Sequence, residues 1–354
     1  MNRFAALLDR LAYEPSRNAK LRLMTEYFRV TPDPDRGYAL AAMTGALSFR
    51  HAKPGIIRAL IAERTEPMLF ALAYDYVGDL SETVALMWTP LGGLRPPPSP
   101  GLPSKTGVNA LLGGGIALSH VVTTLATLGK AELPRQLAAW LDALDETGRW
   151  ALLKLVTGAL RIGVSARLAK TAVAALGDKA PDEVELVWHS LAPPYLALFA
   201  WIEGRSDRPV SHDPAPFRPV MLSHAIEEPD FPALDPAAFA AEWKWDGIRV
   251  QAVAGEANGR RVTRLYSRSG EDISGAFPDL TDALRFNGAL DGELLILREG
   301  RVQSFNVLQQ RLNRKTIDAK LLAQFPAHVR AYDLLAENGE DLRDKPFAAR
   351  RARP

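Results

Sequence analysis

The first half of the chain has apolar residues at helical spacing. Between positions 4 and 11 the apolar side chains recur with a period near 3.6 residues, which predicts an amphipathic helix. The segment 31–35 (Thr-Pro-Asp-Pro-Asp) predicts a helix break followed by a new N-terminal cap, and Pro54 predicts the start of a further helix. The pattern is helical over residues 1–88 and again from about 108 to 203, so we expect this half to be all α-helical.

Two proline-rich stretches interrupt this pattern. Residues 91–104 combine glycine and proline, which predicts a semi-rigid surface linker or an excursion inside the helical region. Residues 204–236 contain closely spaced prolines, which are typical of a domain boundary. We therefore expect a helical domain at 1–205, a linker and entry segment at 206–235, and a second domain at 236–354.

Beyond this boundary the hydrophobic period becomes that of β-strands, because apolar and polar side chains alternate. The predicted elements are strands at 248–253 and 261–266, a hairpin formed by 294–297 and 302–305, and short helices at 277–286 and 306–312. The predicted fold class is therefore multidomain, with an all-α N-terminal domain followed by an α+β domain.

Composition limits the classes of function. With 354 residues, the chain is long enough for two domains that each bury a core, and 47% apolar and 24% charged residues are typical of globular proteins. The sequence contains no cysteine, which excludes disulfides, thiolate zinc sites and cysteine nucleophiles and makes a cytoplasmic location the default. No apolar run is long enough to span a bilayer and the N-terminus is not a secretory signal, so no membrane partner is expected.

The net charge of +2 is uninformative, but its distribution is not uniform. The last twelve residues are basic: Arg343, Lys345, Arg350, Arg351 and Arg353 stand against Asp344 alone. Such an end can neutralise phosphates. The alternative is a solvated tail, which is the more common role of a run of charge.

The candidate chemistry centres on residues 242–249 (Glu-Trp-Lys-Trp-Asp-Gly-Ile-Arg). If this segment is extended, Glu242, Lys244 and Asp246 share one face and the two tryptophans share the other. An ordinary lysine has a pKa of about 10.4, so on the order of one molecule in a thousand is unprotonated at neutral pH. Nearby positive charge or desolvation would activate such an amine as a nucleophile. The plainer alternative is a strand with its charges in water and its tryptophans in the core.

Three downstream segments carry further candidate residues. Arg268 lies in the polar turn 267–272, Glu293 ends an Asp-Gly-Glu run ahead of an apolar strand, and Tyr332 follows a strand-like segment. Each has a plain alternative when taken singly, because short motifs are weak signals. Arg268 could be a surface turn residue, Glu293 an exposed strand start, and Tyr332 a core aromatic.

Taken together and in this order, these segments resemble the ATP-dependent DNA ligases. Lys-x-Asp-Gly at 244–247, with a glutamate two residues before the lysine and an arginine five residues after it, is similar to the nucleophile motif of that family. Segments 267–272, 291–293 and 332–335 resemble its following motifs. The helical first half, with Leu-Arg-Ile-Gly-Val-Ser at 160–165, resembles the DNA-binding domain that precedes the catalytic core, so the resemblance covers nearly the whole chain.

The resemblance implies covalent nucleotidyl transfer. Lys244 would attack the α-phosphate of ATP, release pyrophosphate and hold AMP through a phosphoramide bond. AMP would then pass to the 5′-phosphate of a DNA nick, and attack by the 3′-hydroxyl would seal the strand. ATP and Mg²⁺ are the implied cofactors, because phosphoryl transfer depends on positioning and charge neutralisation. Nicked double-stranded DNA is the implied partner, bound by a monomer in the bacterial cytoplasm at the nucleoid.

The resemblance also implies roles for the surrounding residues. Glu242 would accept a hydrogen bond from the adenine amino group, and Arg249 and Arg268 would contact the ribose and phosphate. Glu293 would hold the ribose hydroxyl or help to bind the metal. Tyr332 would stack on adenine, where the family usually has phenylalanine, since either ring offers a face for stacking.

The sequence departs from the family after position 333. The family continues with a motif that carries a second glutamate, another that carries a pair of lysines, and an OB-fold domain, and the 354 residues contain none of these. We therefore expect a truncated ligase with an incomplete adenylation domain and a missing C-terminal OB fold. The intact protein would be an enzyme, and this chain would not be a competent one.

Several alternatives stay open from the sequence. RNA ligases and capping guanylyltransferases use the same lysine motif, but the long helical first half favours duplex DNA. NAD-dependent DNA ligases share Lys-x-Asp-Gly, but their N-terminal module differs. A protein that binds duplex DNA without catalysis, with a relic second domain, is the alternative from a different class.

Overall fold

The computed structural model describes residues 1–90, 116–158, 160–210, 213–312, 314 and 317–353. The predicted linker at 91–104 and the predicted helical pattern near 108 lie outside these residues. The chain forms two compact units, Met1–Val184 with Leu191–Pro209, and Glu185–Ser190 with Val210–Pro354. No helix in the described ranges is both long and apolar enough to cross a membrane.

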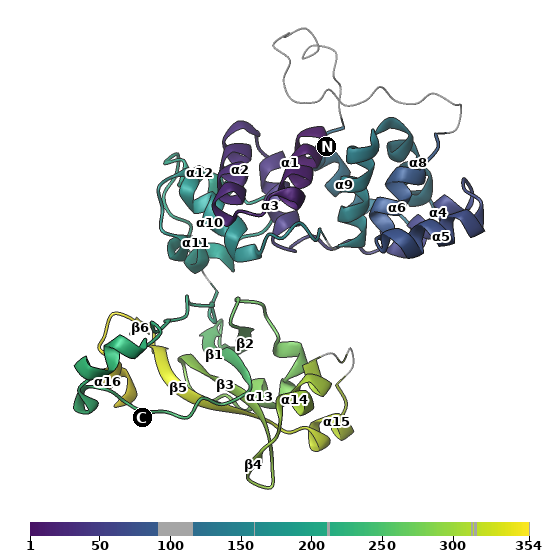
Figure 1. Cartoon of the computed structure of the whole chain (residues 1–354). Helices are drawn as coiled ribbons and strands as arrows, with labels where there is room; N and C mark the ends of the chain where they lie inside the picture. The colour runs from purple at the N-terminus through teal and green to yellow at the C-terminus, as the bar shows by residue number, and fades with distance from the viewer. Residues whose placement is uncertain (91–115, 159, 211–212, 313, 315–316, 354) are drawn as a thin grey trace. The chain divides into compact units, whose positions relative to one another are not determined.

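The regular elements described in the first unit are helices (Figure 1). In chain order they are α1 (Asn2–Tyr13), α2 (Arg17–Val30), α3 (Asp35–Met43), α4 (Pro54–Ala62), α5 (Pro67–Val77), α6 (Leu80–Met87), α7 (Leu118–Thr127), α8 (Leu133–Ala143), α9 (Glu146–Thr157), α10 (Ala166–Leu176), α11 (Pro181–Trp188, whose last residues belong to the second unit) and α12 (Leu196–Ile202).

Local sequence explains several of these helices. The predicted apolar stripe of α1 is confirmed, because Phe4, Leu7, Leu8 and Leu11 are all buried. The predicted break at 31–35 is confirmed too, since α2 ends at Val30 and α3 begins at Asp35. The predicted cap at this break is wrong for α3, whose N-terminus has no side-chain cap. The Asp35 carboxylate instead accepts the backbone N–H groups of Leu118 and Ser119 at 3.1 and 2.9 Å, so it caps α7.

The second unit is built around an antiparallel sheet in the order β2-β1-β3-β5-β6, with β4 paired to β3 (Figure 1). The strands are β1 (Ile248–Ala257), β2 (Arg260–Ser267), β3 (Gly288–Arg298), β4 (Arg301–Val302), β5 (Ala327–Glu337) and β6 (Glu340–Asp341). The helices are α13 (Pro278–Ala283), α14 (Phe305–Leu312), α15 (Ala319–Gln324) and α16 (Phe347–Arg351), with 3-10 turns η1 (Glu228–Ala233), η2 (Pro236–Ala238) and η3 (Ser274–Ala276).

The predicted strands and short helices of this unit are confirmed. The hairpin is confirmed with one correction, because its second strand stops at Val302 and Phe305 already begins α14. Glu299 and Gly300 both have positive φ, 50° and 73°, which is the backbone of a tight hairpin turn.

The sheet has two different faces. Val250, Leu294 and Ile296 pack with Phe277 and Leu308 from the helical side. Residues one position out of phase, such as Val253, Tyr266 and Ala289, pack with Ala215 and Phe217 from the entry segment, because successive strand residues point to opposite faces. Arg249 is in phase with Val253 and therefore lies on this second face, as does Gln251, whose side-chain amide bonds both the N–H and the carbonyl of Arg218.

Candidate functional site

Lys244 lies in an irregular segment just ahead of the sheet. Residues 241–245 have no regular structure, and β1 pairs with β3 only from Ile248, opposite Leu294. The plainer alternative, a strand with its charges in water and both tryptophans in the core, is wrong, because Trp243 is 85% exposed. Trp245 is half-buried, with the Arg330 guanidinium 4.5 Å from its ring. Lys244 is exposed and makes no hydrogen bond or ion pair with the described residues.

Gly247 brings this segment against β3. A side chain at this position would place its Cβ 2.4 Å from the Leu294 carbonyl oxygen, which no residue larger than glycine allows. Gly247 therefore has a steric role in the motif, because it lets the chain that carries Lys244 run close to β3.

Arg249 is oriented by a buried carboxylate. Its Nε and Nη2 donate to the two oxygens of Asp291 at 3.2 and 2.6 Å, and Nη2 also donates to the Met221 carbonyl at 2.6 Å. The Asp291 side chain is only 1% exposed, so this bidentate pair is shielded from water. The sequence predicted no role for Asp291, and its only signal was an acidic residue beside the candidate Glu293.

Glu293 lies within β3 and not ahead of it, which corrects the interpretation of the Asp-Gly-Glu run as a strand start. In the sheet it stands opposite Arg249 on β1 and Arg330 on β5. Burial raises the pKa of the Glu293 carboxyl. The hydrogen bond that this carboxyl accepts from the Gly247 N–H, and the positive charges of Lys244 and Arg249, lower the pKa but do not cancel this rise. Glu293 is thus a partly desolvated carboxyl close to the exposed lysine.

Tyr332 occupies a β-bulge. Asp291 pairs with Asp333 and Gly292 pairs with Ala331, so Tyr332 is the extra residue on β5. A bulge re-aims the side chain that it carries. The ring is half-buried with the Arg249 guanidinium 5.8 Å from its centre, and burial together with the negative charge of Asp291 raises the pKa of the hydroxyl.

Arg268 follows β2 beside the start of β1. Ser267 is the last paired residue of β2 and stands opposite Val250, so Arg268 follows at the position opposite Arg249. The turn is closed by a backbone hydrogen bond of 2.8 Å from Ser267 to Glu271, and Gly270 has a φ of 82°. The Arg268 side chain is exposed and forms no ion pair within the described chain, so it is available to a ligand but not positioned by protein contacts.

Glu242 is connected to the cluster through α16. Arg351 donates to the Glu242 carboxylate at 2.5 Å and to the Tyr332 carbonyl at 2.9 Å. The other basic residues near this end are also paired, Arg350 with Asp333, Arg353 with Glu337 and Glu340, Arg343 with Asp341, and Lys345 with Glu340. These basic side chains therefore lie against carboxylates of the folded unit and do not form a separate tail. Their role in neutralising phosphates stays a prediction.

The structure thus brings the candidate residues together where β1 begins and β2 ends, beside the middle of β3 and β5. Arg249, Glu293 and Tyr332 surround the buried Asp291, Lys244 lies beside Glu293, and Glu242 and Arg268 flank this group on either side. We call these residues the Lys244 cluster: Glu242, Lys244, Arg249, Arg268, Asp291, Glu293 and Tyr332. An exposed amine with guanidinium groups nearby suits the binding of an anionic substrate and attack on it.

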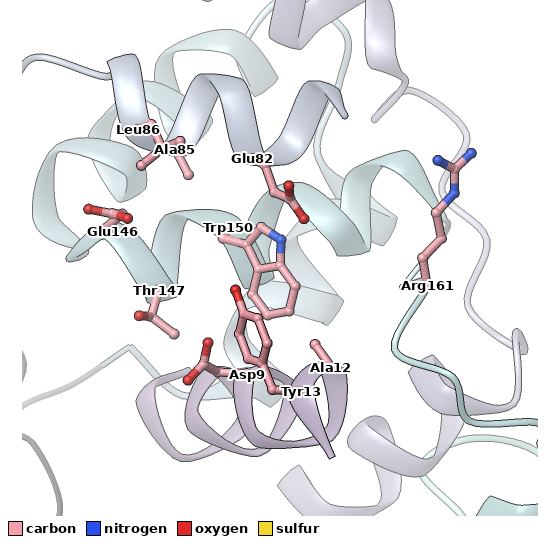
Figure 2. A pocket seen from close by; sticks show the side chains of 10 residues that line it. All are labelled: Asp9, Ala12, Tyr13, Glu82, Ala85, Leu86, Glu146, Thr147, Trp150 and Arg161. Atoms are coloured by element: carbon pink, nitrogen blue, oxygen red, sulfur yellow. The ribbon is translucent and has the colours of Figure 1, made fainter. Parts of the chain in front are cut away.

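A second candidate site lies in the first unit, where α1 and α6 both pack against α9. They enclose a groove of about 380 Å³ (Figure 2). Its lining includes three carboxylates, Asp9, Glu82 and Glu146, around Tyr13 and Trp150. Arg161 is the one basic residue of this lining, so carboxylates outnumber basic groups there, whereas Lys244, Arg249 and Arg268 match the three carboxylates of the Lys244 cluster. The Lys244 cluster is therefore the better candidate for an anionic substrate.

Comparisons with known proteins agree with this choice. A family model described as "ATP dependent DNA ligase domain" matches residues 220–353, which contain the whole cluster. DNA ligase 1 of Korarchaeum cryptofilum is 26% identical, over 99% of this chain and 63% of its own length. A probable DNA ligase of Opitutus terrae is 28% identical, over 99% of this chain and 40% of its own length. The chain therefore spans only part of each relative.

One solved structure, titled Pmar-Lig_PreS3, aligns with 94% of this chain and 57% of its own at 14% identity. Its TM-score is 0.40, a level at which the likeness carries no argument about the fold.

Proposed function

Because this chain belongs to the ATP-dependent DNA ligase family, we propose that it carries the nucleotide-transfer site of a DNA ligase, with Lys244 as the residue that accepts AMP. The supporting observation is the state of Lys244. It is exposed and has no partner among the described residues, yet it lies next to the half-buried Glu293. A lysine that served the fold would be paired or would lie flat on an apolar surface.

In the proposed first step, the Lys244 Nζ lone pair forms a bond to the α-phosphorus of ATP. The bond from that phosphorus to the oxygen bridging the α- and β-phosphates breaks, and pyrophosphate leaves with its electron pair. The ammonium proton passes to solvent before attack. The product is AMP joined to Lys244 through a phosphoramide bond, which is a covalent intermediate of the kind that divides one difficult transfer into two easier ones.

The other members of the cluster would bind and orient the nucleotide. Glu242 would accept the adenine amino group, and the bulged Tyr332 would stack on the base. Arg249 uses Nε and Nη2 for Asp291 and Met221, which leaves Nη1 to contact the ribose or phosphate. The exposed Arg268 would contact the phosphates when substrate arrives. Asp291 would not touch substrate, and its role would be to hold Arg249 in place.

The residues also fit Mg²⁺. No group of three or more metal-ligating side chains that could hold an ion by themselves occurs in the described ranges. Mg²⁺ usually enters nucleotide sites with few protein carboxylates and completes its shell with phosphates and water. We assign Glu293 as the carboxylate that would bind Mg²⁺. The same side chain would also contact the ribose hydroxyl. The ion would neutralise charge on the phosphates.

We propose duplex DNA with a nick as the substrate of the later steps. AMP would move from Lys244 to the 5′-phosphate of the nick, and the 3′-hydroxyl would then displace AMP and join the strand. We propose the helical first unit as the DNA-binding domain, acting as a monomer on the bacterial nucleoid. In this proposal the first unit is helical throughout and contacts the DNA.

The test is transfer of label from ATP carrying ³²P on the α-phosphate, with magnesium present. The motifs absent from the sequence predict a chain that is not a competent ligase, but the residues of the Lys244 cluster lie together, so we expect the first step alone to proceed. We expect label that stays on the wild-type protein after denaturation, is absent with Lys244→Ala, and is retained with Lys320→Ala. Lys320 is an exposed lysine of α15 and serves as the matched control. Label that survives in Lys244→Ala would place the nucleophile elsewhere. A wild-type protein that takes no label but binds nicked duplex would favour the non-catalytic DNA-binding alternative.

A further inference from the structure

Arg351 connects three elements that are far apart in the sequence. It is the last residue of α16, and its Nη1 donates to Glu242 at 2.5 Å and to the backbone carbonyl of Tyr332 on β5 at 2.9 Å. Its guanidinium also lies 5.6 Å from the centre of the Phe347 ring. The group is therefore fixed on one side by α16 and β5, and its other contact is the carboxylate that precedes Lys244.

A buried ion pair anchors the helix that carries Arg351. The neighbouring Arg350 donates from Nε and Nη2 to the two oxygens of Asp333 at 2.7 and 2.9 Å, and its Nη1 donates to the Lys345 carbonyl. The side chains of Arg350 and Asp333 are only 5% and 10% exposed. Because Asp333 directly follows Tyr332, this pair fixes α16 next to the bulge.

Glu242 has little else to orient it. It lies in the irregular, exposed segment ahead of β1, and Arg351 is its ion-pair partner in the described chain. A glutamate side chain that is free in water samples many rotamers, and holding one of them costs entropy when a ligand binds. Arg351 bonds Oε1, and Oε2 accepts no hydrogen bond from the described residues, so one oxygen is held while the other can accept a donor.

We propose that Arg351 is a positioning residue that sets Glu242 for recognition of an amino group on the base, and thereby determines selectivity for adenine over 6-oxo purines. This inference rests on the proposed nucleotide site. A carboxylate only accepts hydrogen bonds, so a fixed Glu242 oxygen would attract the 6-amino group of adenine and repel the 6-oxo group of hypoxanthine. A polar group that is held in place discriminates more sharply than one that can turn away.

This ion pair is suited to selectivity rather than to stability. The side chains of Arg351 and Glu242 are 45% and 42% exposed, and exposed pairs contribute little to folding. Removal of Arg351 is therefore expected to leave the unit folded, so that a change in nucleotide selectivity can be measured without a change in the amount of folded protein.

The experiment compares self-adenylation with ATP and with inosine triphosphate, which lacks the 6-amino group. Each molecule is labelled once, so the readout is the ratio, for the two nucleotides, of the maximal labelling rate constant divided by the half-saturating nucleotide concentration (KM). We expect Arg351→Ala to lower this ratio about fivefold, mainly through a higher KM for ATP, as loss of orientation at one charged hydrogen bond predicts. Arg351→Lys keeps the charge but loses the planar fork, and is expected to restore only part of the ratio.

The matched control is Arg353→Ala. Arg353 lies two residues further on and pairs with Glu337 and Glu340 on β5 and β6, away from Glu242. It is expected to keep the wild-type ratio. In a Glu242→Gln background, Arg351→Ala is expected to change the ratio no further, because its effect acts through Glu242.

The outcomes separate this inference from the proposed function. A wild-type protein that takes label from ATP, with an Arg351→Ala variant that keeps the wild-type ratio, overturns the inference alone. An equal loss for both nucleotides would also overturn it, because a merely structural role predicts that result. If the wild-type protein takes no label, the ratio of the dissociation constants for ATP and inosine triphosphate replaces the ratio of labelling rates. A wild-type protein that binds neither nucleotide would overturn both the proposed site and this inference.

Discussion

Two glutamates, one in each unit, show how differently this molecule treats its charges. In the first unit, Glu203 and Asp33 surround Arg36, whose side chain is 6% exposed and whose Nε and Nη2 donate to Asp33 at 2.7 and 2.8 Å. Hydrogen bonds from Arg36 lower the pKa of Glu203 to about 2. In the second unit, burial raises the pKa of Glu293, and the nearby Lys244 makes no ion pair with the described residues.

We interpret this difference as one between charges that serve the fold and charges that, in the proposed function, bind a ligand. Arg36 is satisfied on all sides, since Nη1 and Nη2 both reach Glu203, Nη1 also reaches the Phe28 carbonyl, and the Phe199 ring lies 4.3 Å away. Within the Lys244 cluster, Lys244 and Arg268 form no ion pair with the described residues, whereas Arg249 is paired with Asp291. We therefore expect mutations around Arg36 to lower stability more than labelling, and mutation of Lys244 to lower labelling more than stability.

The largest expected effect on stability is at Arg36. Arg36→Ala removes a buried guanidinium and its packing on Phe199, and leaves the partly exposed Asp33 and Glu203 with only Arg205 as a partner. It is expected to lower the free energy of unfolding by about 3–4 kcal/mol. Lys244→Ala is expected to change it by less than about 0.5 kcal/mol while abolishing labelling by ATP. Urea unfolding of both variants measures the difference. Equal destabilisation by the two substitutions would contradict the distinction between the two groups of charges.

Asp291 belongs to the Lys244 cluster but is buried, so its mutation is expected to affect both stability and labelling. Asp291→Asn removes the charge that holds Arg249 and is expected to cost about 3 kcal/mol of stability and also to reduce labelling. The control is Asp341→Asn, which breaks a more exposed pair with Arg343 and is expected to cost less than about 1 kcal/mol. Normal labelling by a folded Asp291→Asn protein would show that Arg249 does not need this partner.

A smaller effect is expected in the acid range. Because the folded-state pKa of Glu203 is lowered from 4.5 to about 2, the unfolded chain takes up a proton first as pH falls. The stabilisation is therefore present above pH 4.5 and is lost as pH falls through about 2. Its size is on the order of 2 kcal/mol after allowance for partial exposure. Between pH 6 and pH 2 the free energy of unfolding should decrease less steeply for Glu203→Gln than for the wild type.

The smallest effect has the opposite sign. Because the folded-state pKa of Glu293 is raised above its ordinary value of 4.5, its favourable contribution is present below that pH and is lost as pH rises through the folded value. Glu293→Gln should therefore be slightly more stable than the wild type at pH 7, by less than about 1 kcal/mol, and equal to it near pH 3. Thermal unfolding at the two pH values tests this. A less stable variant at pH 7 would show that Glu293 serves the fold.

The sequence alone determined the features that depend on neighbouring residues. Apolar spacing predicted α1 and the positions of β1 and β2, and the turn residues predicted the hairpin between β3 and β4. The alternation expected of a half-buried strand is wrong for β1, because residues 250–255 are buried on both faces of the sheet. The order of the motifs was enough to indicate the ligase family, because the spacing of Lys244 from its flanking Glu242 and Arg249 is a local property of the chain.

Tertiary structure decided which of these residues meet. Asp291 pairs with Arg249 across two strands, and the bulge at Tyr332 exists only in the register between β3 and β5. Arg351 reaches Glu242 over 109 positions of sequence. Periodicity reports the face on which a residue lies, but pairing depends on register and on the docking of α16. Many distant segments must pack together to fix both, so no local pattern in the sequence encodes either one.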